Sequence, residues 1–556
     1  MPGRRSDGRN TQAKGDLVQK TSDFANGDVS FWFRDIGPPP RRAALTGPID
    51  VDVAIVGAGL TGLWTAYYLA KAVPELSVAI LEKEFAGFGA SGRNGGWLSG
   101  EPAGQFRRYA KAHGSHRAKE LQQHMFSSID EVIEVAKNEG IEADIVKDGL
   151  IHVATNNAQL RRLTHHVEEL RTQGWDKDDL FVLSREELDE RVKVAGALGA
   201  FWTPHCARVH PAKFTVGLAR VVERLGVTIY EDTPATSITA RVVKTSRGTV
   251  TAKYIVSALE GYTDSLAGHR RQLLPMNSSM IVTEPLPESV WDEIGWRGAE
   301  LVGDMGHTFA YSQRTADGRI AMGGRGVPYN FASSFDPGGI TAMKTVDQLM
   351  QKLQSLFPAL SQRSVQHTWT GVLGVPRDWC AAVNFDRGSG IGSAGGYVGH
   401  GLTGTNLAAR TLRILSSTAT PKPPGCPGLA VMPVVGKSSP SDGSARRRCM
   451  PPIVKEIARK QARRATRRPR PPELLMRSPA VNRLLLGGAT TAAGRTCAGL
   501  PRYSSRCARA CRRGGSGSAR RSRVVSGSWR GTSIDQFGQL VTGSCLGGVA
   551  DRVAHA

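Results

Sequence analysis

The stretch VDVAIVGAGLTGLWTAYYLA, residues 51–70, constrains the fold more than any other part of the chain. A β-branched run leads into three glycines, Gly57, Gly59 and Gly62, and an Ala- and Leu-rich segment follows them. This order predicts a buried strand, a tight turn and a helix. In such a unit the first glycine permits the turn, the second lets a pyrophosphate approach the backbone, and the third lets the helix pack on the strand. The sequence therefore predicts a Rossmann-like dinucleotide-binding unit in an α/β protein.

The two segments that follow indicate which dinucleotide fits. The run SVAILEKE ends a second predicted strand at Glu82 and Lys83, and Glu82 lies 20 residues beyond Gly62. A carboxylate at Glu82 accepts hydrogen bonds from a ribose diol and repels a 2′-phosphate, which excludes the NADP type. Residues 86–100, AGFGASGRNGGWLSG, then offer many backbone N–H groups without bulk. A nicotinamide-binding domain would continue with an ordinary helix here, so this segment favours a longer cofactor.

At these residues the chain resembles the FAD-dependent D-amino-acid oxidase superfamily, and within it the γ-glutamylputrescine oxidoreductases most closely. The resemblance covers about residues 31–415 and also rests on two further segments. Residues 248–266 resemble the strand that returns beside the adenosine, with Glu260 where members often carry Asn. Residues 395–415 resemble the C-terminal flavin-binding turn and helix. The cofactor that this resemblance implies is FAD.

The resemblance implies a cofactor site drawn from three segments, with no metal ion. The backbone N–H groups around His400 open a predicted helix, whose N-terminus stabilises the negative charge of a reduced flavin. Arg93 and Gly371 occupy the two positions that carry a covalent flavin link in relatives, which predicts non-covalent FAD. The cofactor-binding residues predicted on this basis are Gly57, Gly59, Leu60, Thr61, Gly62, Glu82, Lys83, Gly89, Ala90, Ser91, Arg93, Asn94, Gly95, Gly96, Trp97, Gly399, His400, Gly401, Leu402 and Thr403.

The activity that the resemblance implies is oxidation of an amine C–N bond to an imine, with hydride transfer to flavin N5. Some members bind an amino-acid carboxylate through an Arg in the segment that resembles residues 367–379, where this chain has Leu373. This difference favours γ-glutamylputrescine or another primary or secondary amine as substrate. A D-amino acid, glycine or an N-methyl amino acid such as sarcosine is the alternative. The candidates for a catalytic side chain are His400, Arg325 and Tyr311, and the electron acceptor stays open between O2 and an electron-transfer protein.

The expected architecture is a discontinuous FAD-binding domain with an inserted α+β substrate domain. Residues 119–140 have helical periodicity, and the runs at 278–286 and 318–324 predict strands that lie over the isoalloxazine. Residues 1–44 are expected to form an N-terminal extension. The FAD-binding domain is expected at about residues 45–110, 205–270 and 365–415, and the substrate domain at about residues 111–204 and 271–364.

The composition changes after residue 415. Residues 421–556 hold 22 Arg and 4 Lys against 5 acidic residues, whereas the first 420 residues hold 46 basic and 44 acidic residues. This Arg-rich tail, residues 416–556, has little apolar periodicity, so disorder is expected there. Two interpretations stay open. In the first, the tail is an arm that binds nucleic acid or an anionic membrane, and it is then compatible even with an inactive flavoprotein fold whose function is nucleic-acid binding. In the second, the tail is the out-of-frame translation of GC-rich DNA.

We expect a cytoplasmic protein, and the partner that the resemblance implies is a small-molecule amine. The chain has no run of 18 or more apolar residues, and the Arg-containing N-terminus lacks the apolar region of a secretion signal. Cys206 and Cys380 are the two cysteines that precede the tail. Two isolated cysteines do not form a disulfide framework, so none is expected.

Overall fold

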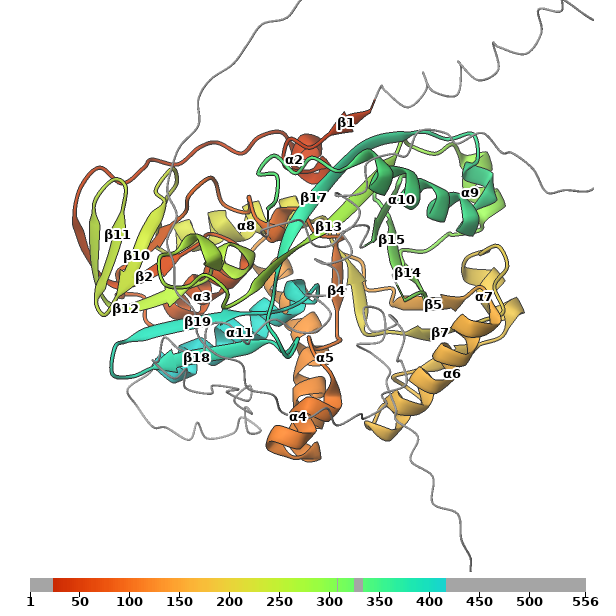
Figure 1. Cartoon of the computed structure of the whole chain (residues 1–556), viewed down its shortest axis with the longest axis horizontal. Coiled ribbons are helices and arrows are strands. Elements are labelled where there is room, and N and C mark those ends of the chain that lie inside the picture. The colour runs from red at the N-terminus through yellow and green to blue at the C-terminus, as the bar shows by residue number, and fades with distance from the viewer. Residues whose placement is uncertain (1–23, 308, 325–333, 417–556) are drawn as a thin grey trace, which may run out of the picture. The chain divides into compact units, whose positions relative to one another are not determined.

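The computed structural model describes residues 24–307, 309–324 and 334–416, and shows two large sheets with helices packed against them (Figure 1). This is the expected α/β class with a Rossmann-like sheet. Three expectations lie outside the described residues: Arg325, residues 1–23 of the N-terminal extension, and the tail from residue 417 onward. In the described part of the chain, no helix is long and apolar enough to cross a membrane.

The first sheet carries the predicted glycine turn at the end of its central strand. Its strands run in the order β10-β11-β12-β2-β3-β9, and β12 also pairs with β19, which pairs with β18. The strand β2 (Ile49–Val56) lies parallel to both β12 (Thr249–Ser257) and β3 (Val78–Leu81). The other strands of this sheet are β9 (Thr228–Tyr230), β10 (Ala235–Thr239), β11 (Val242–Thr245), β18 (Ala382–Asp386) and β19 (Ile391–Gly395).

Alternate residues of β2 are buried on opposite faces of this sheet. Val53 and Ile55 belong to the core that contains the helices, whereas Ala54 and Val56 belong to a separate core built with β11 and β12. A parallel strand that is buried on both faces is apolar at successive positions, which explains the uninterrupted run VAIV. The helices that pack in the first of these cores include α3 (Leu60–Ala72), α8 (Pro211–Arg224) and α11 (Gly401–Ser416).

The second sheet has nine strands in the order β1-β17-β13-β16-β15-β14-β5-β7-β6. Helix α10 (Met343–Leu356) packs against β13 and β16, and its apolar face joins the core of this sheet. The strands are β1 (Ala25–Asn26), β5 (Leu150–Ala154), β6 (Phe181–Leu183), β7 (Gly199–Thr203), β13 (Leu274–Thr283), β14 (Leu301–Asp304), β15 (Ala310–Arg314), β16 (Ile320–Gly324) and β17 (Val365–Val375). The helices around it include α6 (Asn157–Thr172), α7 (Arg185–Arg191) and α9 (Glu288–Ile294).

The elements expected for the inserted domain are present. The predicted helix is α5 (Ser115–Asn138), which follows α4 (Phe106–His113) and buries the residues that repeat along one of its faces. The two predicted strands are β13 and β16, which pair antiparallel. Strand β17 pairs with β13 along its length, so residues 365–375 lie in the second sheet and not in the sheet of the FAD-binding domain. After β17, the chain returns to the first sheet with β18.

An N-terminal strap, residues 24–45, connects the two sheets. Its strand β1 pairs with β17, and its helix α2 (Phe31–Ile36) packs against α8. The Trp32 Nε1 donates to the Asn94 carbonyl at 2.8 Å, and the Ser30 hydroxyl donates to the Gly92 carbonyl at 2.7 Å. The strap therefore holds the second glycine-rich segment from outside.

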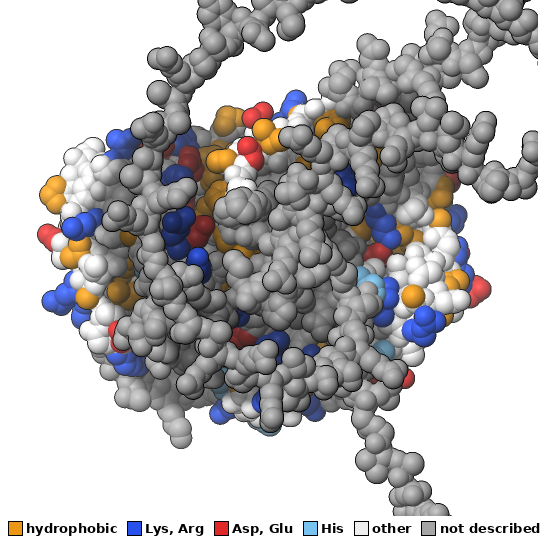
Figure 2. Space-filling view, in the orientation of Figure 1, with side chains coloured by type: hydrophobic (Ala, Val, Ile, Leu, Met, Phe, Trp, Pro, Cys, Tyr) orange, Lys and Arg blue, Asp and Glu red, His pale blue; other side chains and the backbone are white. Residues whose placement is uncertain are grey.

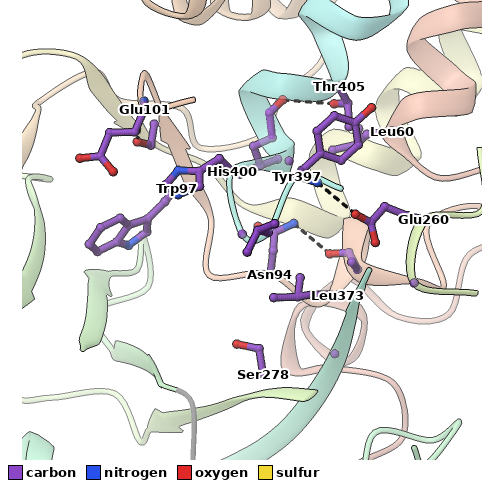
Figure 3. A pocket seen from close by; sticks show the side chains of 18 of the residues that line it. Leu60, Asn94, Trp97, Glu101, Glu260, Ser278, Leu373, Tyr397, His400 and Thr405 are labelled. Carbon is purple, nitrogen blue, oxygen red and sulfur yellow. Dashed lines mark hydrogen bonds between the residues drawn. The ribbon is translucent and has the colours of Figure 1, made fainter. Parts of the chain in front are cut away.

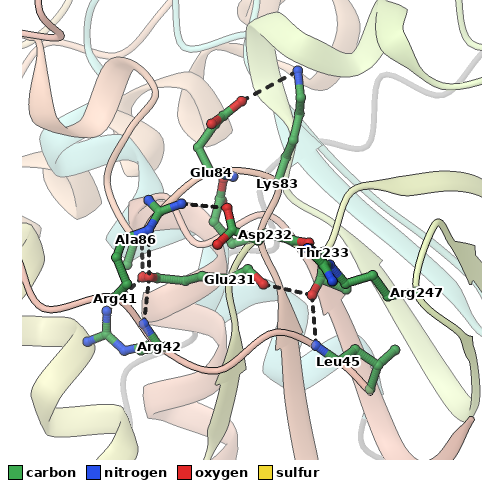
Figure 4. A network of polar contacts seen from close by, with 11 residues as sticks. Arg41, Arg42, Leu45, Lys83, Glu84, Ala86, Glu231, Asp232, Thr233 and Arg247 are labelled. Atoms are coloured by element: carbon green, nitrogen blue, oxygen red, sulfur yellow. Dashed lines mark hydrogen bonds and ion pairs between the residues drawn. The ribbon is translucent and has the colours of Figure 1, made fainter. Parts of the chain in front are cut away.

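The far end of the strap is anchored by a buried carboxylate, Glu231 (Figure 4). Glu231 Oε1 lies 2.9 Å from Arg42 Nη1 and accepts the Ala86 N–H at 3.0 Å, while Oε2 accepts the Arg42 N–H at 2.9 Å. The side chain of Glu231 is 0% exposed, so its charge depends on these partners. Arg42 also pairs with Glu223 of α8 at 2.5 Å.

Basic and acidic side chains are interspersed over the described surface that is visible in Figure 2. This mixture agrees with the near-equal numbers of the two kinds in the first 420 residues. The charge signal of the sequence therefore belongs to the tail and not to this part of the chain.

Candidate functional site

A cavity of about 710 Å³ extends from the glycine turn at the end of β2 to the second sheet. Its lining comes from the turn and the start of α3, the second glycine-rich segment, the turn before α11, and strands β13, β15 and β17. Small-molecule sites occupy roughly 300–1,000 Å³, so the cavity has a suitable size. The three segments predicted to bind a cofactor therefore line one continuous space.

The three glycines of the turn have different surroundings. Gly57 has φ +107°, and a Cβ on it would lie 2.8 Å from the Ala258 carbonyl oxygen. A Cβ on Gly62 would lie 2.0 Å from the Gly57 oxygen, so Gly62 lets α3 pack on the turn. A Cβ on Gly59 would meet only Ser91 Oγ, at 3.0 Å, and would otherwise stand in the cavity. Gly59 thus leaves a space beside the N-terminus of α3, where an anion is favoured.

The Glu82 carboxylate is held at the end of β3, beside the turn. Its Oε2 accepts the Ala58 N–H at 2.8 Å and its Oε1 accepts the Glu84 N–H at 2.9 Å. Burial raises the pKa of Glu82, and the two N–H donors act in the opposite direction. Glu82 and Lys83 both line the cavity. This is the position from which the sequence predicted a contact with a ribose diol.

The second glycine-rich segment is fastened by its own polar side chains. The Arg93 guanidinium donates to the carbonyls of Phe88 (2.8 Å), Pro337 (2.7 Å) and Thr370 (3.2 Å). The Asn94 side chain donates to two carbonyls of the same segment and accepts a backbone N–H within it. Arg93 therefore holds the backbone around the cavity and has its guanidinium committed to carbonyls.

Glu260 holds the turn before α11 in place. Its carboxylate accepts the N–H groups of Gly396 (3.0 Å) and Tyr397 (3.2 Å), and also that of Gly374 in β17. Burial raises the pKa of Glu260 to about 7, although these donors favour the charged form. The bond to Tyr397 is drawn in Figure 3. Glu260 thereby connects β12, β17 and the turn that carries His400 into the cavity lining.

Two glycines lie against the aromatic rings that form the floor at the far end of the cavity. Tyr311, Gly303 and His152 are directly paired across β15, β14 and β5, so their side-chain positions share one face of the sheet. A Cβ on Gly303 would lie 3.2 Å from both the Trp97 and His152 rings. A Cβ on Gly323, the next residue in this row, would lie 2.2 Å from the Tyr311 ring. The missing side chains let the aromatic rings lie against the sheet.

The polar groups on this floor are uncharged. Tyr311 Oη and Ser278 Oγ are 3.0 Å apart, and the Tyr311 and Trp97 rings meet edge to face at 5.7 Å. Burial lowers the pKa of His152 to about 4, so its ring is neutral near pH 7. Within the described residues, both ring nitrogens of His152 and Trp97 Nε1 are buried without a hydrogen-bond partner. Buried polar atoms are normally satisfied, so this end of the cavity is suited to a polar ligand group.

Most of the predicted cofactor residues line the cavity, and three do not: Gly62, Gly96 and Thr403. Gly62 and Gly96 are required for packing, because a Cβ on Gly96 would lie 2.2 Å from Val209 O and Gln313 Nε2. Of the catalytic candidates, Tyr311 and His400 line the cavity and Arg325 lies outside the described residues. Three residues that the sequence did not predict also line the cavity: Glu101, His152 and Ser278. Glu101 could have been found from the alternation of Trp97, Ser99 and Glu101, whereas His152 and Ser278 depend on strand pairing.

Comparison with known proteins agrees with this geometry. The family model described as FAD dependent oxidoreductase (DAO) matches residues 52–413. The chain belongs to this family. Gamma-glutamylputrescine oxidoreductase of Escherichia coli K12 is 31% identical over 376 residues, which cover 66% of this chain and 84% of that protein. Glycine oxidase of Bacillus subtilis 168 is 22% identical over 330 residues, covering 58% of this chain and 80% of that protein.

Solved structures show the same fold. A glycine oxidase from Geobacillus kaustophilus matches with a TM-score of 0.55 at 22% identity, over 66% of this chain and 94% of that chain. An L-proline dehydrogenase from P. horikoshii matches with a TM-score of 0.53 at 18% identity, over 68% of this chain and 96% of that chain.

The chain is an FAD-dependent oxidoreductase, and its residues fit this cofactor. The open space at Gly59 suits a pyrophosphate, and the carboxylate of Glu82 lies on the same lining. The N-termini of α3 and α11 border the same cavity, and both favour negative charge. Gly371 lies against Arg93, with a Cβ position 3.3 Å from Arg93 Cβ, so neither attachment position offers a His or Cys. Non-covalent binding stays a prediction.

Proposed function

We propose that this enzyme oxidises the C–N bond of an amine that carries no free α-carboxylate at the reacting end. The best-supported class is γ-glutamylputrescine or a similar primary or secondary amine. The similarity to the Escherichia coli gamma-glutamylputrescine oxidoreductase supports this class. The observation that carries the proposal is the uncharged floor of the cavity, where Leu373, Ser278 and Tyr311 lie.

The side chain of Leu373 supports a substrate without a carboxylate at the reacting end. It lies on β17 opposite Met276 of β13 and lines the cavity, at the position where some family members carry an Arg. A guanidinium is the group that binds a carboxylate with two parallel hydrogen bonds, and Leu373 cannot supply it. In the described residues the arginines of the lining are Arg93, Arg107 and Arg162. Arg93 donates to carbonyls, and Arg162 donates to the Met305 carbonyl at 2.8 Å and lies on α6.

The chain's own residues orient the substrate and provide electrostatics. FAD, when bound, would supply the oxidant that takes the α-carbon hydrogen of the amine together with its two electrons, so that an imine forms once nitrogen loses a proton. The hydroxyls of Tyr311 and Ser278 bind the amine nitrogen and direct its lone pair. The aromatic floor around Trp97 excludes water and, by desolvation, lowers the pKa of the bound ammonium, so the neutral amine forms more readily. The N–H groups at the start of α11, in the turn that Glu260 holds, would favour negative charge on a bound cofactor.

A reductive half-reaction tests this function. The purified protein with FAD bound is mixed without oxygen with amines and, separately, with D-amino acids, glycine and sarcosine. Bleaching of the flavin absorbance by amines but not by amino acids is expected. Faster bleaching by sarcosine, glycine or a D-amino acid would establish the alternative substrate class. No bleaching by any of these compounds would contradict both. Repeating the reaction in air and assaying hydrogen peroxide distinguishes O2 from another electron acceptor.

A further inference from the structure

One face of strand β4 (Trp97–Ser99) and of the residues after it runs along the cavity. Trp97, Ser99 and Glu101 all line the cavity, whereas Leu98 is 0% exposed in the core behind it. This is the alternation expected of an extended chain. At about 3.3 Å per residue, Glu101 lies up to about 13 Å along the chain from Trp97. β4 pairs with β8 (Cys206–Arg208), which fixes the direction of this wall.

Glu101 differs from the other carboxylates of the lining. Glu82 and Glu260 accept backbone N–H groups. Asp304 lies 2.5 Å from Lys352 Nζ, and Glu169 lies 3.7 Å from His165 Nδ1. For the Glu101 carboxylate, the described residues provide no hydrogen bond and no ion pair, and burial raises its pKa to about 7.

The position of Glu101 separates it from the reacting end. Trp97 lies with Tyr311 on the uncharged floor, and Glu101 lies four residues further along the same wall. The Gln122 side chain of α5 donates to the Gly100 carbonyl at 2.7 Å, and the Glu101 N–H donates to Ser99 Oγ at 3.2 Å. The backbone at Glu101 is therefore held, and its carboxylate lies at a defined depth in the cavity. Figure 3 shows Trp97 and Glu101 on the same side of the cavity, away from Glu260.

We propose that Glu101 pairs with a second, non-reacting ammonium group of the substrate, so that the substrates are elongated amines with a cationic far end. This inference rests on the proposed function. The reacting nitrogen must be neutral to release electrons, and the uncharged floor suits it. A second nitrogen that remains protonated needs a counter-charge when it leaves water, and the unpaired carboxylate supplies one. An ammonium group beside Glu101 would also lower the pKa of this carboxyl group toward its ordinary value.

The test compares n-alkylamines with α,ω-diamines of the same chain lengths, from butyl to decyl. The enzyme with FAD bound is mixed with each amine without oxygen, and the dependence of flavin reduction on amine concentration yields Kd and the limiting rate. For the chain length that spans the two ends, the diamine should bind roughly 10- to 100-fold more tightly than the monoamine, the effect of one hydrogen bond to a charged group. Glu101→Gln should abolish this preference for diamines.

Glu169→Gln is the matched control, because it removes another carboxylate of the same cavity, one that lies 3.7 Å from His165 Nδ1. It should keep the preference for diamines. Equal Kd values for monoamines and diamines in the wild-type enzyme would overturn the assignment, and this comparison needs no variant. A preference that survives Glu101→Gln, or that disappears only in Glu169→Gln, would also overturn it. If no amine reduces the flavin, the proposed function itself fails, and the assignment fails with it.

Discussion

Substituting Ala at Gly59 and at Gly62 separates cofactor binding from folding within one turn. At Gly62 the added Cβ would lie 2.0 Å from the Gly57 oxygen, against about 3.4 Å for ordinary contact. Helix α3 or the turn would have to move by more than 1 Å, and such overpacking costs about 1–3 kcal/mol or more. At Gly59 the added Cβ would meet only Ser91 Oγ, at 3.0 Å. Because Gly59 is the N-cap of α3 with φ −80°, Ala costs the fold at most about 1 kcal/mol there.

For FAD binding, we expect Gly59→Ala to act directly on the affinity, whereas Gly62→Ala acts through the fold. The Cβ of Gly59→Ala stands where a phosphate would approach the backbone, and loss of one hydrogen bond to a charged group weakens binding by about 1.5–3 kcal/mol, roughly 10- to 100-fold. The assay is thermal unfolding of the FAD-free protein, followed by titration with FAD using flavin fluorescence. Gly59→Ala should unfold nearly as the wild type does and bind FAD weakly, whereas Gly62→Ala should unfold earlier. A Gly59→Ala protein with wild-type affinity for FAD would refute the placement of the pyrophosphate.

Three further outcomes are expected. Acid denaturation should release free FAD into the supernatant, and flavin retained in the washed precipitate would indicate a covalent link. Arg42→Ala removes the nearer cation of buried Glu231 and leaves it only Arg41 Nε at 4.0 Å among the described residues, so it should lower the free energy of unfolding by about 3 kcal/mol in urea. The control Arg41→Ala, at a side chain that is 44% exposed, should cost less than about 1 kcal/mol. The pKa of Glu260 is about 7 when folded, above its unfolded value, so its contribution to stability falls as pH rises from about 4.5 to 7. Glu260→Gln should abolish that part of the pH dependence of thermal unfolding. An unchanged pH profile in this variant would show that Glu260 does not have a raised pKa in the folded protein.

The cofactor half of the site could be predicted from the sequence because its signals are local. Gly57, Gly59 and Gly62 lie within six residues. The positive φ of Gly57 and the contact of Gly62 with the Gly57 oxygen are requirements of the turn itself, whereas the Ala258 carbonyl beside Gly57 comes from a distant part of the chain. Glu82 follows from the length of one β-α-β unit. The helix that begins at Gly401 is likewise preceded by its own glycine-rich turn. Period and spacing along the chain were sufficient for these elements.

The substrate half depends on contacts between distant parts of the chain. His152, Gly303 and Tyr311 become neighbours only when β5, β14 and β15 pair, and no local pattern specifies that register. The same holds for the strap, whose helix α2 reaches residues 62 positions away. The sequence predicts that the FAD-binding domain resumes at about residue 365, whereas the pairing of β17 with β13 places that strand in the second sheet.

By itself the sequence determined the β-turn-α unit, because glycine sterics and apolar periodicity act over a few neighbouring residues. The class of cofactor and the family followed from the resemblance of its glycine-rich segments to those of known flavoproteins. Tertiary structure alone decided that His152 and Tyr311 lie on one face of the second sheet. It also decided that Arg93 is committed to carbonyls and that Glu101 is the unpaired carboxylate of the lining in the described residues. The physical reason is that burial and pairing of a charge depend on every element that surrounds it. Those elements here come from both sheets and from segments more than 200 residues apart in the sequence.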